Sequence, residues 1–233
     1  LNLIADYAGG GLCAAVGILA ALMARNQTGK GQYVDIAMTD GVFYMMASLI
    51  SSHFAEGAEF QRGTSRLNGG APYYNVYETK DGKYLTIAAI EPWFWQNLCR
   101  ALDLEDLAPY QNAQGEQQAT VFKALRETFI TRTRDEWFES LKDQNISVGK
   151  VYSLAEAIDD PQIAQRGMVV EVEAPGVPGG KVSQVGIPMQ LADTPGKVRH
   201  VGAVAGEHTS QVLEGLGYTP EHVEDMRRRQ VVE

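Results

Sequence analysis

The sequence opens with LNLIADYAGGGLCAAVGILAALMAR (residues 1–25), in which one carboxylate, Asp6, stands before three glycines and an apolar run. An aspartate suits the start of a helix because it accepts hydrogen bonds from free backbone N–H groups and complements the helix dipole. The stretch therefore predicts that Asp6 caps a helix continuing to about Arg25. The longest apolar run, Leu12 to Met23, is shorter than a bilayer requires, so we expect a buried helix.

Asp6 permits two interpretations. In the chemical one, glycines 9 to 11 leave the backbone open to a ligand, and free N–H groups beside them at the helix start stabilise an enolate or a thioester oxyanion. In the structural one, Asp6 is only a cap and the glycines only allow close packing. A helix start also lowers the pKa of an acid, which favours a base or a nucleophile. Spacing alone favours the structural interpretation.

A turn signal at residues 26–31 ends this helix. Residues 32–37 are then typical of a short buried strand, and residues 40–54 of a second apolar helix. Residues 55–72 show neither strand nor helix periodicity and are rich in Gly, Glu and Arg, so we predict a linker that ends in NGGAP (68–72). Its glycine turn fits a mobile loop over a site and a plain linker equally well.

The clearest local signal is a β-hairpin. Residues 73–78 and 83–88 alternate and favour strands, and TKDG (79–82) lies between them. Pro92 then opens a helix to about Leu102. The other predicted elements are helices at 116–131, 134–144, 207–216 and 220–230, a short helix after Ser153, strands at 148–152, 168–173 and 181–186, and capping boxes at Thr133–Glu136 and Ser153–Glu156. This order predicts a mixed α/β protein.

The bulk composition is that of a globular protein. Of 233 residues, 45% are hydrophobic and 21% are charged, and the formal net charge is −9. The acidic balance argues against nucleic acid as a partner, because phosphate binding requires a basic surface. Low cysteine use and the lack of a signal-peptide pattern favour a cytoplasmic location, and we expect no membrane partner.

Several familiar chemistries have no support in the sequence. Cys13 and Cys99 form no metal or redox motif and stand in apolar surroundings, so we expect two buried thiols. No two histidines lie three to five residues apart, as metal ligands often do, and no serine occupies a G-x-S-x-G elbow. Neither a phosphate loop nor a G-x-G-x-x-G fingerprint after a strand is present. The sequence therefore predicts no metal site.

A second carboxylate, Glu91, follows the predicted strand and precedes Pro92. Active-site residues often lie at such junctions between a strand and a helix. The alternative is a glutamate that only complements the dipole of the helix it precedes. Spacing alone favours this structural role.

Several segments, in the same order along the chain, resemble the family III CoA-transferase superfamily and, within it, the α-methylacyl-CoA racemases. The segments are LNLIADYAGGG (1–11), similar to the racemase catalytic segment; TGKGQYVDIAM (28–38), similar to the stretch that follows it; GGAPYY (69–74) and AIEPWF (89–94), similar to the racemase branch; and GEHT (206–209) with LEGLG (213–217), similar to the family's ending. Such motifs in order are more specific than any one of them. They favour the chemical interpretations of Asp6 and Glu91.

The resemblance implies an α/β fold in which a Rossmann-like large domain is linked to a smaller α+β domain. It also implies an interlocked homodimer, with each active site between the large domain of one subunit and the small domain of the other. The expected divisions are 1–54 in the large domain, 55–72 as linker, 73–175 as small domain and 176–233 returning to the large domain. The chain is then a C-terminal fragment, inactive alone, that lacks an upstream histidine and most of the CoA site.

The resemblance also assigns roles to single residues. The family's catalytic aspartate matches Asp6, and a glutamate that orients the upstream histidine matches Glu91. The expected substrate-binding positions are Asn2, Gly9, Gly10, Gly69 and Gly70. The substrate is an acyl-CoA, so coenzyme A belongs to the substrate and no separate cofactor is expected.

Three functions remain open at this point. A racemase of 2-methylacyl-CoA thioesters in fatty acid metabolism would use Asp6 in 1,1-proton transfer at the α-carbon. A CoA-transferase would use Asp6 as a nucleophile that forms an aspartyl-CoA thioester. The third possibility is a dimerising fragment without catalysis. The Glu91–Pro92 pair favours the racemase, because transferases of this superfamily usually carry other residues there.

Overall fold

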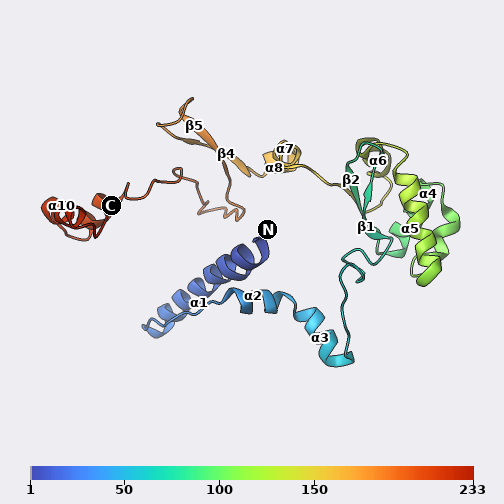
Figure 1. Ribbon diagram of the computed structural model, residues 1–233, viewed down its shortest axis with the longest axis horizontal. Coiled ribbons are helices and arrows are strands. Elements are labelled where there is room, and N and C mark those ends of the chain that lie inside the picture. Colours follow the sequence, from blue (N-terminus) through green and yellow to red (C-terminus); the bar gives the residue numbers. More distant parts are fainter. Residues whose placement is uncertain (1) are drawn as a thin grey trace. The chain divides into compact units, whose positions relative to one another are not determined.

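A computed structural model describes residues 2–233, and Figure 1 labels its helices and strands. The contacts within the chain divide it into two units. The first unit ends at Val151 and the second runs from Tyr152 to Glu233. Both contain helices and small antiparallel sheets, so the mixed α/β class is confirmed. The finer domain boundaries expected at residues 54, 72 and 175 stay predictions.

The N-terminal segment forms one long helix. Leu3–Leu12 (η1) is wound as a π-helix and continues into the α-helix Cys13–Thr28 (α1), which ends at Gly29 in the left-handed conformation. The predicted cap at Asp6 is wrong, because the helix begins directly after Asn2. Asp6 lies in its first turn, and the Asp6 N–H donates to the Asn2 carbonyl at 3.1 Å.

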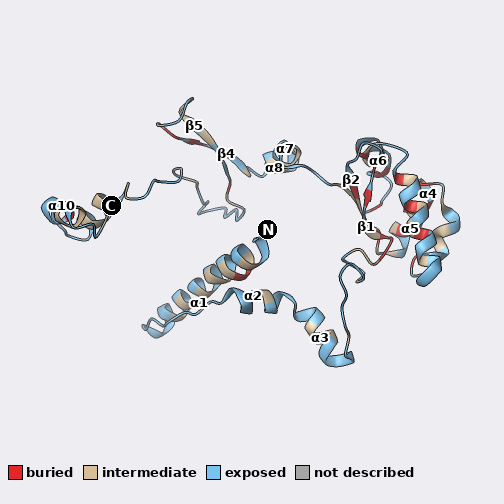
Figure 2. Ribbon diagram, in the orientation of Figure 1, coloured by how far each residue is buried: buried red, intermediate tan, exposed pale blue. Residues whose placement is uncertain are grey.

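This helix also differs from expectation in length and burial. Together η1 and α1 span 26 residues, Leu3–Thr28, because the helix already includes the glycines that precede the apolar run. It is long and apolar enough to cross a membrane, but core helices of soluble proteins and signal sequences pass the same test, so this is weak evidence for a span. Within the described residues α1 has no buried side chain, and Figure 2 shows it as exposed and half-buried. The expected buried helix is therefore wrong for this chain taken by itself.

The segment after α1 departs from two further predictions. Residues 32–37 are exposed and form no strand, because none of the described residues pairs with them. The helix expected at 40–54 is two helices, Met38–Met45 (α2) and Ala47–Glu56 (α3), separated at Met46. The backbones of η1 and α2 approach closely: a Cβ atom built on Gly41 would lie 2.4 Å from the Gly9 carbonyl oxygen.

The rest of the first unit is built around the predicted hairpin, which is confirmed. An antiparallel sheet in the order β1-β2-β3 packs against helices through a buried cluster that includes Tyr77, Leu85, Trp95, Leu98 and Phe129. The elements are Tyr74–Glu78 (β1), Tyr84–Ala88 (β2), Pro92–Ala101 (α4), a 3-10 helix at Glu105–Tyr110 (η2), Gly115–Phe129 (α5), Arg134–Leu141 (α6) and Val148–Lys150 (β3). The capping box at Thr133 and Glu136 is present.

The second unit has short elements joined by long irregular stretches. A two-stranded antiparallel sheet, β4-β5, matches the predicted strand pair, and the Ser153–Glu156 capping box is present. The elements are Leu154–Ile158 (α7), Pro161–Gln165 (α8), Val169–Glu173 (β4), Lys181–Val185 (β5), Thr209–Gly215 (α9) and Pro220–Arg228 (α10). No helix was predicted at α8, whereas the predicted ends of the other elements differ from these by only a few residues.

The cluster on α4 generates a stability prediction. Leu98 is fully buried, so Leu98→Ala should lower the free energy of unfolding by about 2–5 kcal/mol through lost burial and a residual cavity. Urea denaturation followed by tryptophan fluorescence measures this change, because Trp95 and Trp137 are both buried in this cluster. Leu154→Ala is the matched control, since Leu154 is 86% exposed. Equal effects of the two substitutions would contradict the assigned core.

Candidate functional site

The antiparallel register of β1 and β2 brings two predicted site segments to one end of the sheet. Tyr74 pairs with Ala88, so the glycines just before β1 and Glu91 just after β2 leave the sheet at the same edge. The Ala89 N–H donates to the Tyr73 carbonyl at 2.8 Å, which extends the pairing beyond the strands. Gly69, Gly70 and Glu91, distant in sequence, therefore belong to one end of the hairpin.

Glu91 occupies the N-cap position of α4. Its backbone is extended (φ −69°, ψ 139°), Pro92 follows at the first helical position, and the Glu91 carbonyl accepts from the Trp95 N–H at 3.1 Å. The Glu91 side chain is half-buried and makes no capping hydrogen bond. Its carboxylate is therefore not used to close the helix end, which leaves it available for chemistry at the edge of the hairpin.

Gln111 holds the backbone just before Glu91. Its side chain is buried, and its Nε2 donates to the Ala89 carbonyl at 3.2 Å and to the Ile90 carbonyl at 2.8 Å. Sequence analysis missed this residue, because nothing in the pattern separates it from the nearby glutamines at 114, 117 and 118. Only the fold shows which glutamine points inward.

The glycine turn is a built structure and not a featureless linker. The Gly70 N–H donates to the Ser65 carbonyl at 3.0 Å, and a Cβ atom on Gly70 would lie 2.0 Å from the Thr64 oxygen. Asn75 Nδ2 donates to the Gly69 carbonyl at 2.9 Å, and Gln118 Nε2 donates to the Gly70 carbonyl at 3.2 Å. Glycine is therefore required at position 70 for close packing of the turn on itself.

Beyond the glycines the chain is anchored by a tyrosine. Tyr77 is buried, and its hydroxyl donates to the Pro72 carbonyl. Burial raises the pKa of Tyr77, although the Arg126 charge acts in the opposite direction. The hydroxyl thus stays protonated and remains a donor, so this end of the turn is held at any ordinary pH.

A cavity of about 490 Å³ lies beside the glycine turn. It is lined by Leu67, Asn68, Gly69, Tyr74, Asn75, Val76, Thr86, Ile87 and Ala88. Its wall thus combines the turn with the first residues of β1 and the last residues of β2. Gly69, a predicted site residue, is part of this wall, so we place the candidate site at this end of the hairpin.

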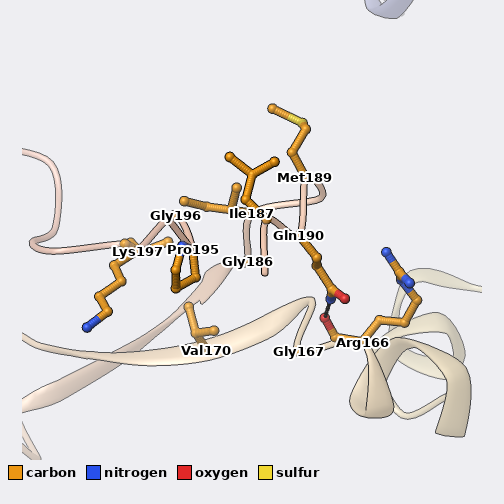
Figure 3. A pocket seen from close by; sticks show the side chains of 12 residues that line it. Arg166, Gly167, Val170, Gly186, Ile187, Met189, Gln190, Pro195, Gly196 and Lys197 are labelled. Atoms are coloured by element: carbon orange, nitrogen blue, oxygen red, sulfur yellow. Dashed lines mark hydrogen bonds between the residues drawn. The ribbon is translucent and has the colours of Figure 1, made fainter. Parts of the chain in front are cut away.

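The second unit contains another cavity, of about 500 Å³. Figure 3 shows Arg166 and Lys197 on opposite sides of it, with Val170 and Ile187 between, and Gln190 bonded to the Arg166 carbonyl at 2.8 Å. None of the predicted site residues is among those described as lining it. Its size alone does not connect it with the predicted chemistry.

Of the remaining predicted residues, Asp6, Gly9 and Gly10 lie on η1 and Asn2 is its N-cap residue. Asp6 and Asn2 are exposed, Gly10 is half-buried and Gly9 is buried beneath α2. A Cβ atom on Gly9 would lie 2.9 Å from the Met38 carbonyl oxygen, so the missing side chain serves helix packing. We had expected the unbonded N–H groups of this helix beside glycines 9 to 11. Because the helix starts at Leu3, these groups belong to its first turn instead.

The two cysteines differ from each other. Cys99 is buried as predicted, and burial, aided by the Glu105 carboxylate, raises the pKa of its thiol to about 12. Cys13 is only half-buried.

Among residues 2–233, no group of three or more His, Cys, Asp and Glu side chains is arranged to hold a metal ion.

Comparison with known proteins decides the family, because the family description "CoA-transferase family III" matches residues 2–209. The chain belongs to CoA-transferase family III. Over its whole length it is 32% identical to "Alpha-methylacyl-CoA racemase" of Homo sapiens, of which it covers 60%. The chain thus spans about 60% of the length of the curated relatives it matches.

Other family III members lie nearly as close. The chain is 29% identical to "Succinyl-CoA--L-malate CoA-transferase beta subunit" of Chloroflexus aurantiacus, over 98% of this chain and 58% of that relative. The crystal structure of a CAIB/BAIF family protein from Brucella suis superimposes with a TM-score of 0.71 at 23% identity, covering 90% of this chain and 54% of that one. This structure supports the fold alone, whereas the relatives include both racemases and transferases.

The close packing of the glycine turn can be tested by adding one methyl group. Gly70→Ala should lower the free energy of unfolding by about 1–3 kcal/mol, because the new Cβ meets backbone atoms of Thr64 that cannot simply move aside. Gly31→Ala is the matched control, since nothing lies within 4 Å of a Cβ there. Thermal unfolding of both variants gives the comparison, and a neutral Gly70→Ala would refute the described turn.

The difference between the thiols predicts their reactivity. Iodoacetamide at about pH 8 should alkylate Cys13 and spare Cys99, because only a thiolate reacts and Cys99 is buried with a raised pKa. Peptide mass spectrometry quantifies each site. Unfolding in denaturant should expose both thiols equally, which serves as the control. Rapid labelling of Cys99 in the folded chain would contradict its burial.

Proposed function

We propose that this protein acts as a racemase of 2-methylacyl-CoA thioesters. The observation that carries the proposal is the Glu91 carboxylate, which makes no capping hydrogen bond to α4. Glu91 stands between the end of β2 and Pro92, in the segment that resembles racemases. The racemase from Homo sapiens, alignable over the whole chain, supports this choice. The substrate would be an acyl-CoA, so no separate cofactor is required.

In the proposed reaction Asp6 is one of two acid–base groups. The thioester acidifies the α-carbon because the resulting enolate is delocalised, and Asp6 would exchange a proton with one face of that carbon. Asp6 is exposed on the first turn of η1, so its carboxylate can meet a ligand. First-turn N–H groups of the helix would favour the enolate charge. Proton exchange at the opposite face of the α-carbon would be carried out by a histidine, which the family resemblance predicts upstream of Asp6.

The other residues have supporting roles in this proposal. Glu91 would orient the histidine. Gly10, on the same helix as Asp6, and Asn2, the N-cap residue of that helix, would contact the thioester. Gly69 and Gly70 would contact the substrate from the end of the hairpin, where Gly69 lines the cavity. Gly9 contributes indirectly, because it lets α2 pack against η1.

We also propose an interlocked homodimer in the cytoplasm. The support is the large number of exposed apolar side chains on the N-terminal helices, such as Leu19, Met23 and Phe43, which are 60%, 66% and 61% exposed. Exposed apolar surface of this extent usually marks an interface. Given the family, burial of this apolar surface against other parts of the whole protein, the partner subunit included, explains its exposure better than burial in a membrane does.

The second candidate is a CoA-transferase. It is supported by transferase relatives that match almost the whole chain at 28–29% identity. In that reaction the Asp6 carboxylate attacks the acyl-CoA carbonyl, which releases CoA thiolate and forms a mixed anhydride. The thiolate then attacks the aspartyl carbonyl of the anhydride, which releases the donor carboxylate and leaves an aspartyl-CoA thioester. Both candidates use Asp6, so the fate of the α-proton separates them.

The test uses the enzyme expressed from its whole reading frame in D₂O with a 2-methylacyl-CoA and no acyl acceptor. We expect deuterium at the α-carbon, and Asp6→Asn should slow its uptake by about 10²–10⁴-fold, since a proton-transfer group is lost. Asp35→Asn removes a comparable exposed carboxylate from the extended segment and should leave the rate unchanged.

Two outcomes would reject the racemase. One is the absence of α-deuterium together with transfer of CoA to a carboxylic acid acceptor once that acid is added. The other is a covalent CoA adduct trapped on Asp6 and found by mass spectrometry. Either result would favour the transferase.

A further inference from the structure

The two site segments at the hairpin end have one feature in common, which is that side-chain amides bind their backbone carbonyls. Asn75 Nδ2 reaches Gly69 at 2.9 Å and Ala71 at 3.3 Å. Gln118 reaches Gly70 at 3.2 Å. Gln111 reaches Ala89 at 3.2 Å and Ile90 at 2.8 Å. We name Asn75, Gln111 and Gln118 the amide clamp.

The chemistry of the primary amide suits this task. A carbonyl oxygen needs a donor, and one NH₂ group has two hydrogens, so a single side chain can hold two carbonyls. Asn75 and Gln111 each do so. Since the peptide group is planar, fixing a carbonyl also fixes the N–H on the other side of the same bond. The clamp therefore sets the orientation of consecutive peptide planes in both segments.

The clamp acts where the regular sheet no longer can. The β1–β2 ladder runs from Tyr74 to Glu78 and from Tyr84 to Ala88, so the clamped carbonyls all lie outside it. The donors come from three different elements: β1, the residue after η2, and α5. Gln118 reaches across 48 positions of sequence to serve Gly70. The core behind the hairpin thus determines the geometry at its open end.

We infer that Asn75, Gln111 and Gln118 are positioning residues, which preorganise Gly69–Gly70 to contact the acyl-CoA thioester and Glu91 to orient its partner. This inference rests on the proposed function. Gln118 acts through the glycine turn, so its loss should weaken substrate binding. Gln111 acts through the junction before Glu91, so its loss should slow the chemical step.

The first arm of the test uses the chain of 233 residues and hydrogen exchange by mass spectrometry. Gln118→Met keeps the side-chain length and removes the donors, so amides in residues 64–71 should exchange about ten-fold faster. Gln117→Met is the matched control, because Gln117 is its exposed neighbour on α5. Unchanged exchange in Gln118→Met would overturn the clamp.

The second arm uses the enzyme from its whole reading frame with a 2-methylacyl-CoA. Gln118→Met should raise KM about five- to ten-fold with kcat within about twofold, whereas Gln111→Met should lower kcat about ten-fold with KM nearly constant. If circular dichroism shows that Gln111→Met does not fold, the comparison of Gln118→Met with Gln117→Met still tests the inference.

Faster hydrogen exchange in Gln118→Met with unchanged KM and kcat would make the clamp merely structural and overturn the inference. No turnover by the unmutated enzyme would instead reject the proposed function, and the exchange arm would still report on the clamp.

Discussion

The register of one antiparallel strand pair determines where the middle of this chain can carry out chemistry. Because Tyr74 faces Ala88, the segments that flank the hairpin must leave the sheet together. A shift of one residue would turn the inward side chains of one strand out of the core, either Tyr77 of β1 or Leu85 and Ile87 of β2, and would displace the glycine turn relative to Glu91. The buried cluster behind the sheet therefore stabilises the register and, through it, the placement of the candidate site.

A second constraint acts at the other end of the chain. Gly9 and Gly41 have no side chains where η1 and α2 cross, and their backbones lie closer than any Cβ atom would permit. This contact orients the helix that carries Asp6 without occupying its exposed face. It also shows why three glycines in a row do not imply three ligand contacts, since one of them is used for packing.

Local signals in the sequence predicted local structure well. The hairpin, the capping boxes at Thr133 and Ser153, and Pro92 at the start of α4 depend on neighbouring residues, and all are present. The strand predicted at residues 32–37 is not formed, because a strand needs a hydrogen-bonded neighbouring strand, which no local pattern can supply. The amide clamp escaped notice for the same reason, since the role of Gln118 depends on a residue 48 positions away. Resemblance to a family supplied Asp6 and Glu91, which spacing alone would have left as helix-start residues.

The division of the candidate site also bears on how one family contains both racemases and transferases. An exposed aspartate on a helix can accept a proton or attack a carbonyl, and its own structure does not select between them. The choice must come from groups that position the thioester, either its α-carbon or its carbonyl, against that carboxylate. In our proposal such groups sit at the hairpin end, which the protein core holds: the glycine turn contacts the thioester and Glu91 orients the second proton-transfer group. A different residue at position 91 could therefore redirect the reaction while the aspartate stays unchanged.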